Sequence, residues 1–483
     1  MQSRPSHFCS RRHFVLSGAY GLGATALAWL LQQDGLLAEP TRPELEERHY
    51  DLLPKRTHHP PRATAMISMF MVGGPSHVDL FDPKPKLVEY DGQPYPGEVK
   101  YDNPAQASSK VMAAPWKFER RGECGMELSE LLPHLGGIAD DISLIRSMRT
   151  GVNNHGQSMY ALHSGRIVGG NPSLGSWLTF GLGSETRDLP AYLVMTHPDG
   201  PPLLAGENWS NGWLPSMYQG TLVRPREPRL LNLEPPAHLR GDAQQRQLAF
   251  LAELNEQHQR EHAGETDLEA RIASYALAAR MQTAAKDALD IRGESQATLA
   301  MYGIDQPETR DYGTRCLIAR RLVERGVRFV QIYNNGQSWD HHSGTLKALP
   351  QRCREIDQPS AALVKDLKSR GLLESTLVHW GGEMGRLPVI QNDFGRDQVG
   401  RDHNTYGFSM WLAGGGVRGG YVHGVTDDFG YQAVADVVTQ HDYHATVLHL
   451  FGLDHAQLAF RRGGQQLALT GGQPAQVVRG LLA

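Results

Sequence analysis

The segment that most constrains the fold runs from Val327 to His342, VRFVQIYNNGQSWDHH, an apolar stretch that ends in polar residues. Both sets of alternate positions in its first half are largely apolar, which predicts a strand covered on both faces. Such a strand is typical of a parallel sheet, and ligands bind outside the carboxyl ends of parallel strands. Asp340 and His342 follow the strand there. Because they are two residues apart, in extended chain both side chains point the same way and could share one metal ion.

The composition is that of a globular protein. The chain has 483 residues, of which 40% are hydrophobic and 21% charged, enough for one large α/β domain or two smaller ones. The net charge is -4 and the body carries no polybasic block. We therefore expect no nucleic-acid partner.

The first 38 residues read as a targeting segment rather than part of the fold. Arg11 and Arg12 precede a weakly apolar, glycine-rich stretch over 15–31, which resembles a twin-arginine export signal. The alternative is a chance arginine pair before an anchor helix, but the glycines make a poor membrane span. We expect export to a periplasmic or other extracytoplasmic location, with no integral span in the mature chain. The proline-rich residues 39–62 read as a linker or arm.

The pattern after residue 63 predicts strands separated by helices. The expected strands are 65–72, 141–148, 189–196, 327–333, 375–380 and 408–413, and the expected helices include 312–325 and 358–370. Alternation of this kind favours right-handed crossovers and a parallel sheet. We predict a three-layer α/β/α sandwich with a largely parallel sheet over 63–483, with a helical insertion at 241–302.

Polar residues recur where these strands end. His155 follows the strand at 141–148, Glu383 follows 375–380, and His403 lies on a polar loop before 408–413. A single histidine in such a place is usually structural. Their recurrence beside Asp340 and His342 favours a metal cluster with His155 facing it across the crevice. Each histidine should donate its other ring nitrogen to an acceptor such as Asp402.

A further candidate pair lies after the first strand, in GGPSHVDLFDPKP. One interpretation makes His77 or Asp79 a metal ligand. In the other, Asp79 and Asp82 cap turns around the two prolines. The sequence leaves both open.

The motifs together resemble the alkaline phosphatase and sulfatase superfamily. More closely, the chain is similar to an uncharacterised sulfatase-like family, abundant in planctomycetes, that carries only a domain-of-unknown-function label. The resemblance runs from about Ala63 to the end. Its most specific marks are GGPSHVDLFDPKP, RRLVERGVRFVQIY with WDHH, GGEMGRLP, GRDHN and GLDHAQLAFRRGGQQLALTGG.

This resemblance implies a metal site and a nucleophile position. Asp340, His342 and His403 would match one metal site of the superfamily, and Glu383 stands where an Asp-His pair usually supplies the other. The nucleophile position, counted back ten residues from Gly165, holds a histidine, His155. Imidazole can attack a phosphoryl group, but His155 could equally be a metal ligand or a relic.

The chain also departs from the superfamily pattern. The first strand is followed by Gly73 and Gly74 where sulfatases place paired aspartates, which puts the second metal site in doubt. A Cys-x-Pro-x-Arg or Ser-x-Pro-x-Arg sulfatase signature is absent from the sequence.

The leading functional expectation is an exported, metal-dependent hydrolase of sulfate or phosphate esters. A divalent metal (Zn, Mn or Ca) would act as Lewis acid, and Arg386 or Arg401 would steady the anion. The substrate would be a small-molecule or glycan ester. The rival is a catalytically inactive member of the fold that binds a glycan or a partner protein. A phosphoglycerate-mutase-like isomerase is a third reading, disfavoured by export.

Overall fold

A computed structural model describes residues 29–30, 50–101, 108–231, 233–261, 266–391 and 395–483. Tyr50–Glu261 and Glu265–Ala483 form one compact unit, which is described below. Apart from residues 29 and 30, the predicted export signal lies outside the described residues. Among the described helices, none combines the length and the apolar character that crossing a membrane requires.

The centre of the unit is a nine-stranded sheet. Its order is β12 (Tyr421–His423), β4 (Ile142–Arg149), β11 (Phe408–Ala413), β8 (Thr376–Gly381), β1 (Ala65–Phe70), β7 (Phe329–Tyr333), β5 (Tyr192–Met195) and β6 (Thr221–Val223), and β15 (Val438–Thr439) also pairs with β4. β11 is antiparallel to both of its neighbours, whereas every other pairing in this sheet is parallel. The predicted fold class, an α/β architecture with a largely parallel sheet, is confirmed.

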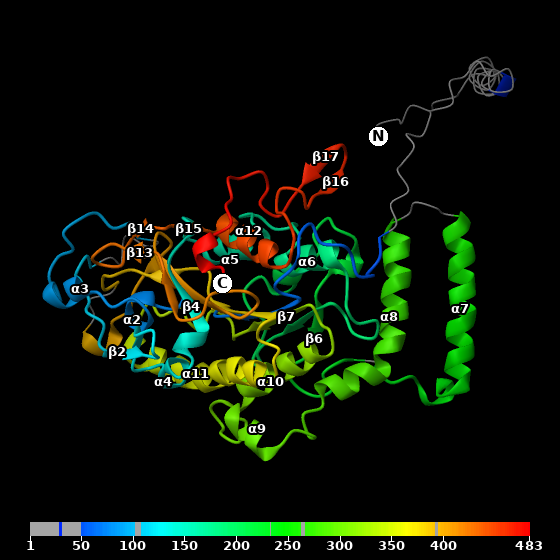
Figure 1. The fold of residues 1–483 in the computed structure, drawn as a ribbon, viewed down its shortest axis with the longest axis horizontal. Coiled ribbons are helices and arrows are strands. Elements are labelled where there is room, and N and C mark those ends of the chain that lie inside the picture. The colour runs from blue at the N-terminus through cyan, green and yellow to red at the C-terminus, as the bar shows by residue number, and fades with distance from the viewer. Residues whose placement is uncertain (1–28, 31–49, 102–107, 232, 262–265, 392–394) are drawn as a thin grey trace, which may run out of the picture. The chain divides into compact units, whose positions relative to one another are not determined.

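Helices cover both faces of the sheet (Figure 1). One layer contains α5 (His155–Ser164), α6 (Leu174–Leu182) and α12 (Gln440–Leu450). The other contains α4 (Pro133–Gly136), α10 (Arg310–Glu324) and α11 (Thr345–Ser369). Two separate apolar clusters fill the spaces between the sheet and these layers.

The alternation of side chains along β1 explains how one strand serves both clusters. Ile67 and Met69 belong to the cluster under α10 and α11, whereas Met66 and Phe70 belong to the cluster under α5, α6 and α12. All four are buried. Because successive strand residues point to opposite faces, a strand between two helical layers is expected to be largely apolar on both faces.

The remaining elements surround this sandwich. The predicted insertion contains α7 (Asp242–Glu261), α8 (Thr266–Leu289) and α9 (Gln296–Met301). Short helices are α2 (His77–Leu80) and α3 (Pro85–Glu89), and two-stranded sheets pair β2 (Phe118–Arg121) with β3 (Met126–Ser129), β9 (Gly385–Arg386) with β10 (His403–Asn404), β13 (Val425–Thr426) with β14 (Ala433–Ala435), and β16 (Phe460–Arg462) with β17 (Gln465–Leu467).

Helix α11 is longer than the sequence predicts. The expected helix covers 358–370, but α11 begins at Thr345 and contains both Pro350 and Pro359. Proline removes a helix hydrogen bond, so the pattern suggests a later start. Burial of an apolar face that includes Leu349 and Ile356 stabilises the longer helix against this local preference.

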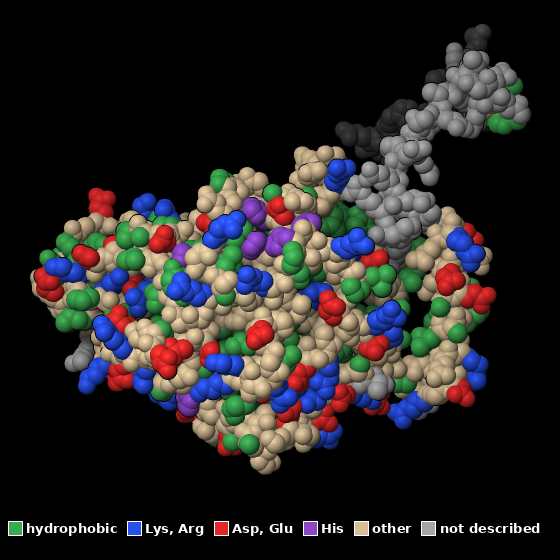
Figure 2. All heavy atoms as spheres, viewed as in Figure 1, with side chains coloured by type: hydrophobic (Ala, Val, Ile, Leu, Met, Phe, Trp, Pro, Cys, Tyr) green, Lys and Arg blue, Asp and Glu red, His purple; other side chains and the backbone are tan. Residues whose placement is uncertain are grey.

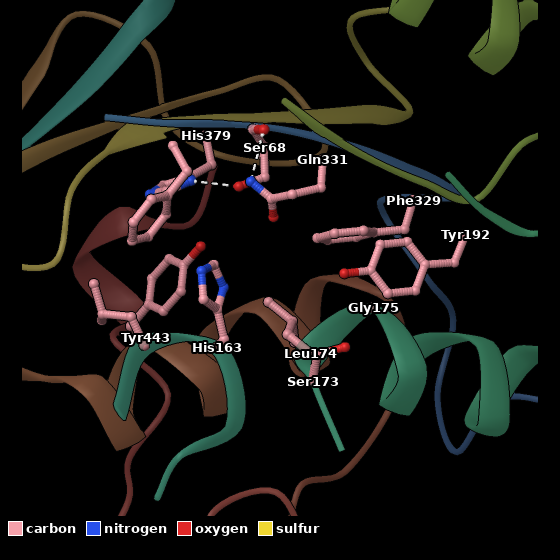
Figure 3. A pocket seen from close by; sticks show the side chains of 12 residues that line it. Ser68, His163, Ser173, Leu174, Gly175, Tyr192, Phe329, Gln331, His379 and Tyr443 are labelled. Atoms are coloured by element: carbon pink, nitrogen blue, oxygen red, sulfur yellow. Dashed lines mark hydrogen bonds between the residues drawn. The ribbon is translucent and has the colours of Figure 1, made fainter. Parts of the chain in front are cut away.

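A small polar cavity of about 20 Å³ lies on the α5 and α12 side of the sheet (Figure 3). The Oγ of Ser68 is 2.9 Å from Nδ1 of His379, and the OH of Tyr333 is 3.1 Å from Nε2 of His163. Burial lowers the pKa of His379 to about 3, and burial followed by neighbouring histidines lowers that of His163 to about 3. These imidazoles are therefore neutral at pH 7.

Candidate metal centre

The parallel strands bring distant polar loops to one edge of the sheet. The chain leaves β4 towards His155, β7 towards Asp340 and β8 towards Glu383. β11 runs in the opposite direction, so it starts at this edge, and His403 precedes it on the short strand β10. The sheet topology therefore gathers residues that are up to 248 positions apart in the sequence.

Local helix chemistry sets the position of His155. Asn154 is the N-cap of α5, and its side chain accepts a hydrogen bond from the backbone N–H of Gln157 at 3.3 Å. Asparagine is a favoured residue at this position because its side-chain oxygen satisfies a free N–H of the first turn. His155 is therefore the first residue of α5, the helix that follows β4.

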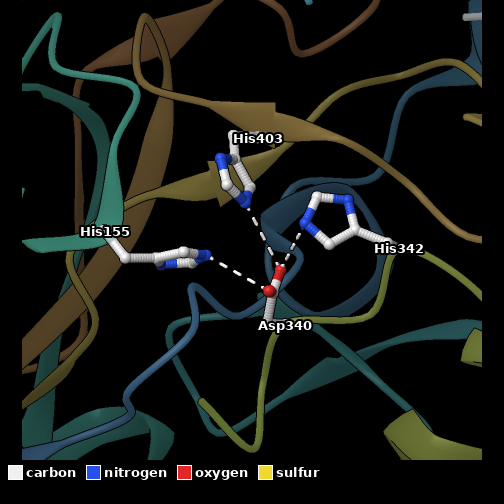
Figure 4. Close-up of side chains that lie close together, drawn as sticks. All are labelled: His155, Asp340, His342 and His403. Carbon is white, nitrogen blue, oxygen red and sulfur yellow. Dashed lines mark hydrogen bonds and ion pairs between the residues drawn. The ribbon is translucent and has the colours of Figure 1, made fainter. Parts of the chain in front are cut away.

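Three imidazoles converge on the carboxylate of Asp340 (Figure 4). The Nε2 of His342 lies 2.9 Å from Oδ1 of Asp340, and Nε2 of His403 lies 3.4 Å from the same oxygen. The Nε2 of His155 lies 3.3 Å from Oδ2. We call these four residues the His/Asp cluster. One potential ligand atom from each lies within 4.8 Å of all the others.

The other ring nitrogen of each histidine faces a hydrogen-bond acceptor. The Nδ1 of His155 donates to Oε1 of Glu383 at 2.7 Å, and Nδ1 of His403 donates to the backbone oxygen of Asn153 at 2.9 Å. The Nδ1 of His342 is hydrogen-bonded to Oε1 of Gln391. These acceptors favour a proton on Nδ1, so that Nε2, which faces Asp340, is the ring nitrogen that would bind a cation.

The charges around Asp340 hold it ionised. Burial opposes ionisation, but hydrogen bonds from the three histidines and the charge of Arg386 hold the pKa of Asp340 far below its usual range. Burial also lowers the pKa of His155, yet its hydrogen bonds to Asp340 and Glu383 dominate and raise the pKa to about 9. Burial lowers the pKa of His403, whereas the hydrogen bond to Asp340 outweighs burial and raises that of His342.

Arg386 fixes both Asp340 and the loop beside it. Its Nη2 lies 2.6 Å from Oδ1 of Asp340, and its Nε donates to the backbone oxygen of Gly74 at 3.0 Å. The same Nη2 also donates to the backbone oxygen of Gly73. Gly73 has a φ of +114°, and a Cβ atom on it would lie 2.5 Å from the backbone nitrogen of Asp340. Only glycine permits this close approach of the two loops.

The other candidates from the sequence lie outside the His/Asp cluster. Arg401 binds Asp79 through Nε and Nη2, each 2.9 Å from a carboxylate oxygen, and both residues are buried. The Nε2 of His77 donates to the backbone oxygen of Gly430 at 2.7 Å, and burial lowers the pKa of this histidine. Asp402 accepts from the backbone N–H of His403 at 2.8 Å and lies 3.7 Å from Nδ1 of His342.

Two groups at the site carry no signal in the sequence. Gln391 contacts His342 through its side chain, and Asn153 contacts His403 through its backbone oxygen alone. A backbone oxygen contributes no residue type to a motif, and Gln391 lies 49 residues from its partner. Neither group could have been found without the tertiary structure.

The donor set fits a divalent metal. Zinc bound to imidazole and carboxylate has bonds of about 2.0 to 2.2 Å in a tetrahedral arrangement, so its ligand atoms stand about 3.3 to 3.6 Å apart. The separations within the His/Asp cluster are of this order. Basic and acidic side chains are interspersed over the visible face of the unit (Figure 2). This face therefore has no single dominant charge.

The search for similar proteins found solved structures but no curated protein that matches. The PsFucS1 sulfatase from Pseudoalteromonas sp. is 13% identical, with a TM-score of 0.36 over 81% of this chain and 68% of that one. The lipoteichoic acid synthase LtaP from Listeria monocytogenes is 9% identical, with a TM-score of 0.35 over 86% and 78%. The phosphonate monoester hydrolase SpPMH from Silicibacter pomeroyi is 14% identical, with a TM-score of 0.28 over 66% and 68%.

A family model gives the widest match to the sequence. Residues 63–482 match the model described as Protein of unknown function (DUF1501). The family model carries the domain-of-unknown-function label that the sequence motifs predict. Because the match covers most of the sequence, the chain belongs to the DUF1501 family of proteins of unknown function.

Proposed function

We propose that this protein is an exported hydrolase of sulfate or phosphate esters that uses one divalent cation held by His155, Asp340, His342 and His403. The observation that carries the proposal is the arrangement of three imidazoles, each with Nε2 towards one carboxylate and Nδ1 against an acceptor. Histidines that bind metals in proteins almost always have such a partner on the second nitrogen.

The ligand types favour zinc or manganese over calcium. Calcium prefers six to eight oxygen ligands, whereas this cluster offers three imidazole nitrogens and a carboxylate. Imidazole suits zinc, and a mixed imidazole and carboxylate set also suits manganese. When bound, such a cation would act as a Lewis acid on a sulfuryl or phosphoryl oxygen.

The contacts of His155 support a role as ligand rather than as attacking group. Its Nδ1 is hydrogen-bonded to Glu383 and its Nε2 faces Asp340, so neither nitrogen is directed at an open space where an ester could be attacked. Glu383 would hold the His155 ring in place. Its Oε1 also accepts a hydrogen bond from the backbone N–H of Gly73 at 2.8 Å, which fixes the carboxylate itself.

Arg386 and Arg401 would stabilise the structure around the cluster rather than bind the substrate. Arg386 neutralises part of the charge on Asp340 and ties it to the first-strand loop. All three side-chain nitrogens of Arg401 already have acceptors: Nε and Nη2 bind Asp79, and Nη1 donates to the backbone oxygen of Leu387 at 3.2 Å. We propose that Asp340 is oriented by Arg386, and that Arg401 does not contact the ester.

Metal analysis and hydrolysis assays test the proposal together. Protein purified without chelator should contain about one zinc or manganese per chain and should hydrolyse p-nitrophenyl sulfate or p-nitrophenyl phosphate. The substitutions His342→Ala and His403→Ala should each lower metal content and hydrolysis together. His238→Ala, at an exposed histidine away from the cluster, is the matched control.

If both cluster variants keep the wild-type metal content, the cluster is not a metal site and the proposal fails. If the metal is present and lost as expected but neither ester is cleaved by the loaded protein, the binding part stands and the hydrolase part does not. The catalytically inactive reading, in which the sheet edge binds a glycan or a protein, would then be the better one.

A further inference from the structure

Helices α7 and α8 form an antiparallel hairpin at one end of the unit (Figure 1). α8 packs against the body of the unit through one face, where Met281, Ala285 and Ala288 are buried. α7, in contrast, has no buried residue. A hydrogen bond of 3.0 Å from Nε2 of Gln244 on α7 to Oε1 of Gln282 on α8 joins the two helices. α7 is therefore the outer helix of the hairpin.

α7 carries an apolar stripe that is open to solvent. Leu248, Leu251 and Leu254 are between 38% and 44% exposed, and Phe250 is 59% exposed. Leu248 and Leu254 project about 120° apart on a helix with about 3.6 residues per turn, and Phe250 widens the stripe to about 160°. The seam between two paired helices is narrower than this. The stripe is therefore wide enough to pack against more than one neighbouring helix.

α8 turns a second apolar face towards α7. Ile272, Tyr275 and Ala279 follow one another at spacings of three and four residues, and Gln282 continues the row. The hydrogen bond between Gln282 and Gln244 shows that this side of α8 faces α7. Tyr275 is nevertheless 68% exposed. The two helices therefore leave part of both apolar faces uncovered.

The uncovered apolar surface is large enough for a stable interface. A fully buried aromatic residue removes roughly 150 to 250 Å² from water, so the exposed parts of Phe250, Tyr275 and the three leucines amount to roughly 500 Å² per copy. Two copies that covered each other would bury roughly 1,000 Å² of apolar surface, and the polar border would bring the total into the range of about 1,200 to 2,000 Å² typical of specific interfaces. Apolar patches of this size mark contact sites.

The charges of α7 favour another protein surface over a membrane. Gln244, Gln247 and Asn255 border the stripe and are uncharged, so two copies would meet without like charges at the border. Arg246 and Glu253 lie on the opposite side of the helix. The carboxylates of α7 outnumber its arginines, which disfavours an anionic lipid surface.

The stripe is also complementary to itself. Leu248 and Leu254 each lie three residues from Leu251, so an antiparallel copy centred on Leu251 places each of these leucines opposite another leucine. A two-fold symmetric interface requires this property, because both partners use the same surface. The helices of two hairpins would then share one apolar core, as in a four-helix bundle.

We propose that two copies of this protein associate through their α7–α8 hairpins into an antiparallel four-helix bundle, with Leu251 at the two-fold axis. The hairpin contains none of the four residues of the His/Asp cluster. The inference therefore goes beyond the proposed function and does not depend on it.

Sedimentation equilibrium of the full chain tests the association. The wild type should be a dimer at concentrations from about 1 to 100 µM, within the range in which interfaces of this size associate. Leu251→Glu should raise the dissociation constant about 30-fold or more, because it places two carboxylates at the axis of the interface. Val88→Glu is the matched control, since Val88 on α3 is 69% exposed and lies outside the hairpin. This control should dimerise as the wild type does.

Disulfide cross-linking tests the position of the axis. Leu251→Cys is introduced after Cys9 and the exposed Cys124 are changed to serine, which leaves the buried Cys316 and Cys353 as the other cysteines. A disulfide requires Cα atoms about 4.4 to 6.8 Å apart, so a residue near the two-fold axis should cross-link two copies on oxidation. Glu253→Cys, on the opposite side of α7, is the matched control and should stay uncross-linked.

Three outcomes would overturn the proposal. These are a wild type that stays monomeric over this range, a Leu251→Glu variant that associates as tightly as Val88→Glu, and a Glu253→Cys variant that cross-links as readily as Leu251→Cys. A monomer that sediments with phosphatidylglycerol vesicles would assign the stripe to a lipid surface instead. Because α7 has no buried residue, circular dichroism of Leu251→Glu should match the wild type. His342→Ala should also dimerise normally, so this inference and the proposed function fail separately.

Discussion

Glu383 accepts a hydrogen bond from Nδ1 of His155 at 2.7 Å, and this contact turns Nε2 of the imidazole towards Asp340. Glu383 is fully buried, so its charge acts at short range with little screening by water. The two residues come from different strand ends, β8 and β4, which the parallel sheet brings to the same edge. The orientation of His155, a candidate metal ligand, therefore depends on the order of the strands in the sheet.

The first prediction concerns this pair. Glu383→Ala should weaken zinc binding about 10-fold to 100-fold, because removing a second partner of a metal-binding histidine typically has an effect of this size. Glu383→Gln retains an acceptor oxygen and should therefore lose less zinc affinity than Glu383→Ala. Competition with a chelator of known affinity measures both, and Glu374→Gln, at an exposed position, serves as control. Equal affinity in wild type and Glu383→Ala would show that the contact does not support a metal.

The second prediction concerns Arg401 and Asp79. Asp79→Asn should lower the free energy of unfolding by about 3 to 5 kcal/mol, because it leaves a buried guanidinium without its charge partner. Urea unfolding measures the change. Breaking the exposed pair between Lys86 and Glu89 with Glu89→Gln should leave the free energy of unfolding almost unchanged, because water screens the two charges. A loss no larger than in this control would mean that the buried pair is not structural.

The third prediction concerns Gly73. Gly73→Ala should displace the loop that carries Asp340, since its Cβ would lie 2.5 Å from a backbone nitrogen. We expect lower metal content together with lower stability. Gly92→Ala is the matched control: Gly92 also has a positive φ, +73°, but no atom lies within 4 Å of the added Cβ. This control should lose only about 1 to 2 kcal/mol from backbone strain and keep its metal. Wild-type metal content in Gly73→Ala would contradict the prediction.

The fourth prediction concerns pH and the buried histidines on the α5 and α12 side of the sheet. Burial holds the pKa of His379 and His163 at about 3 and that of His444 at about 4, although a hydrogen bond to the oxygen of Leu162 opposes the shift in His444. The folded protein therefore keeps these rings neutral below pH 6.5, where the unfolded chain binds protons. Stability is fully present above pH 6.5 and should fall as the pH drops from 6.5 towards 3.

Each of these three histidines adds up to about 1.4 kcal/mol per pH unit to that fall. Among the neighbouring titratable groups, Tyr333 and Tyr443 stay neutral in this range because burial raises the pKa of both. Urea unfolding from pH 7 to pH 4 measures how steeply the free energy of unfolding changes with pH. His379→Gln should reduce that slope by up to about 1.4 kcal/mol per pH unit, which corresponds to one proton. An unchanged slope in this variant would show that another group causes the acid sensitivity.

The fifth prediction concerns export. Changing Arg11 and Arg12 to lysine should leave the precursor in the cytoplasm if the twin-arginine signal is read as expected. Cell fractionation followed by immunoblotting measures the distribution. The single change Lys55→Arg, in the described arm after the signal, should leave export unaltered. Export of the double variant at the wild-type level would contradict the prediction.

The amino-acid sequence determined the layers of the fold and the edge where polar residues gather. Strands such as β1 and β7 are buried at every position and are largely apolar on both faces, so their position and length can be predicted from the sequence. The loops that follow these two strands contain Gly73 and Asp340, which identifies one edge of the sheet. The start of α11 was predicted too late, because Pro350 and Pro359 interrupt the helical pattern of the sequence. Burial of one face of the helix stabilises it in spite of these prolines.

Only the tertiary structure decided which polar side chains meet. Arg401 and Asp79 are 322 positions apart and form a buried pair away from the His/Asp cluster, whereas His155 lies against a glutamate 228 positions away. The physical reason is that the hydrophobic pattern of a strand or helix depends on residues close together in the sequence. The partners of a hydrogen bond between loops depend instead on how the whole sheet brings those loops together. The sequence could therefore nominate His155, His342 and His403, while the partners of their second nitrogens depended on the packing of the whole sheet.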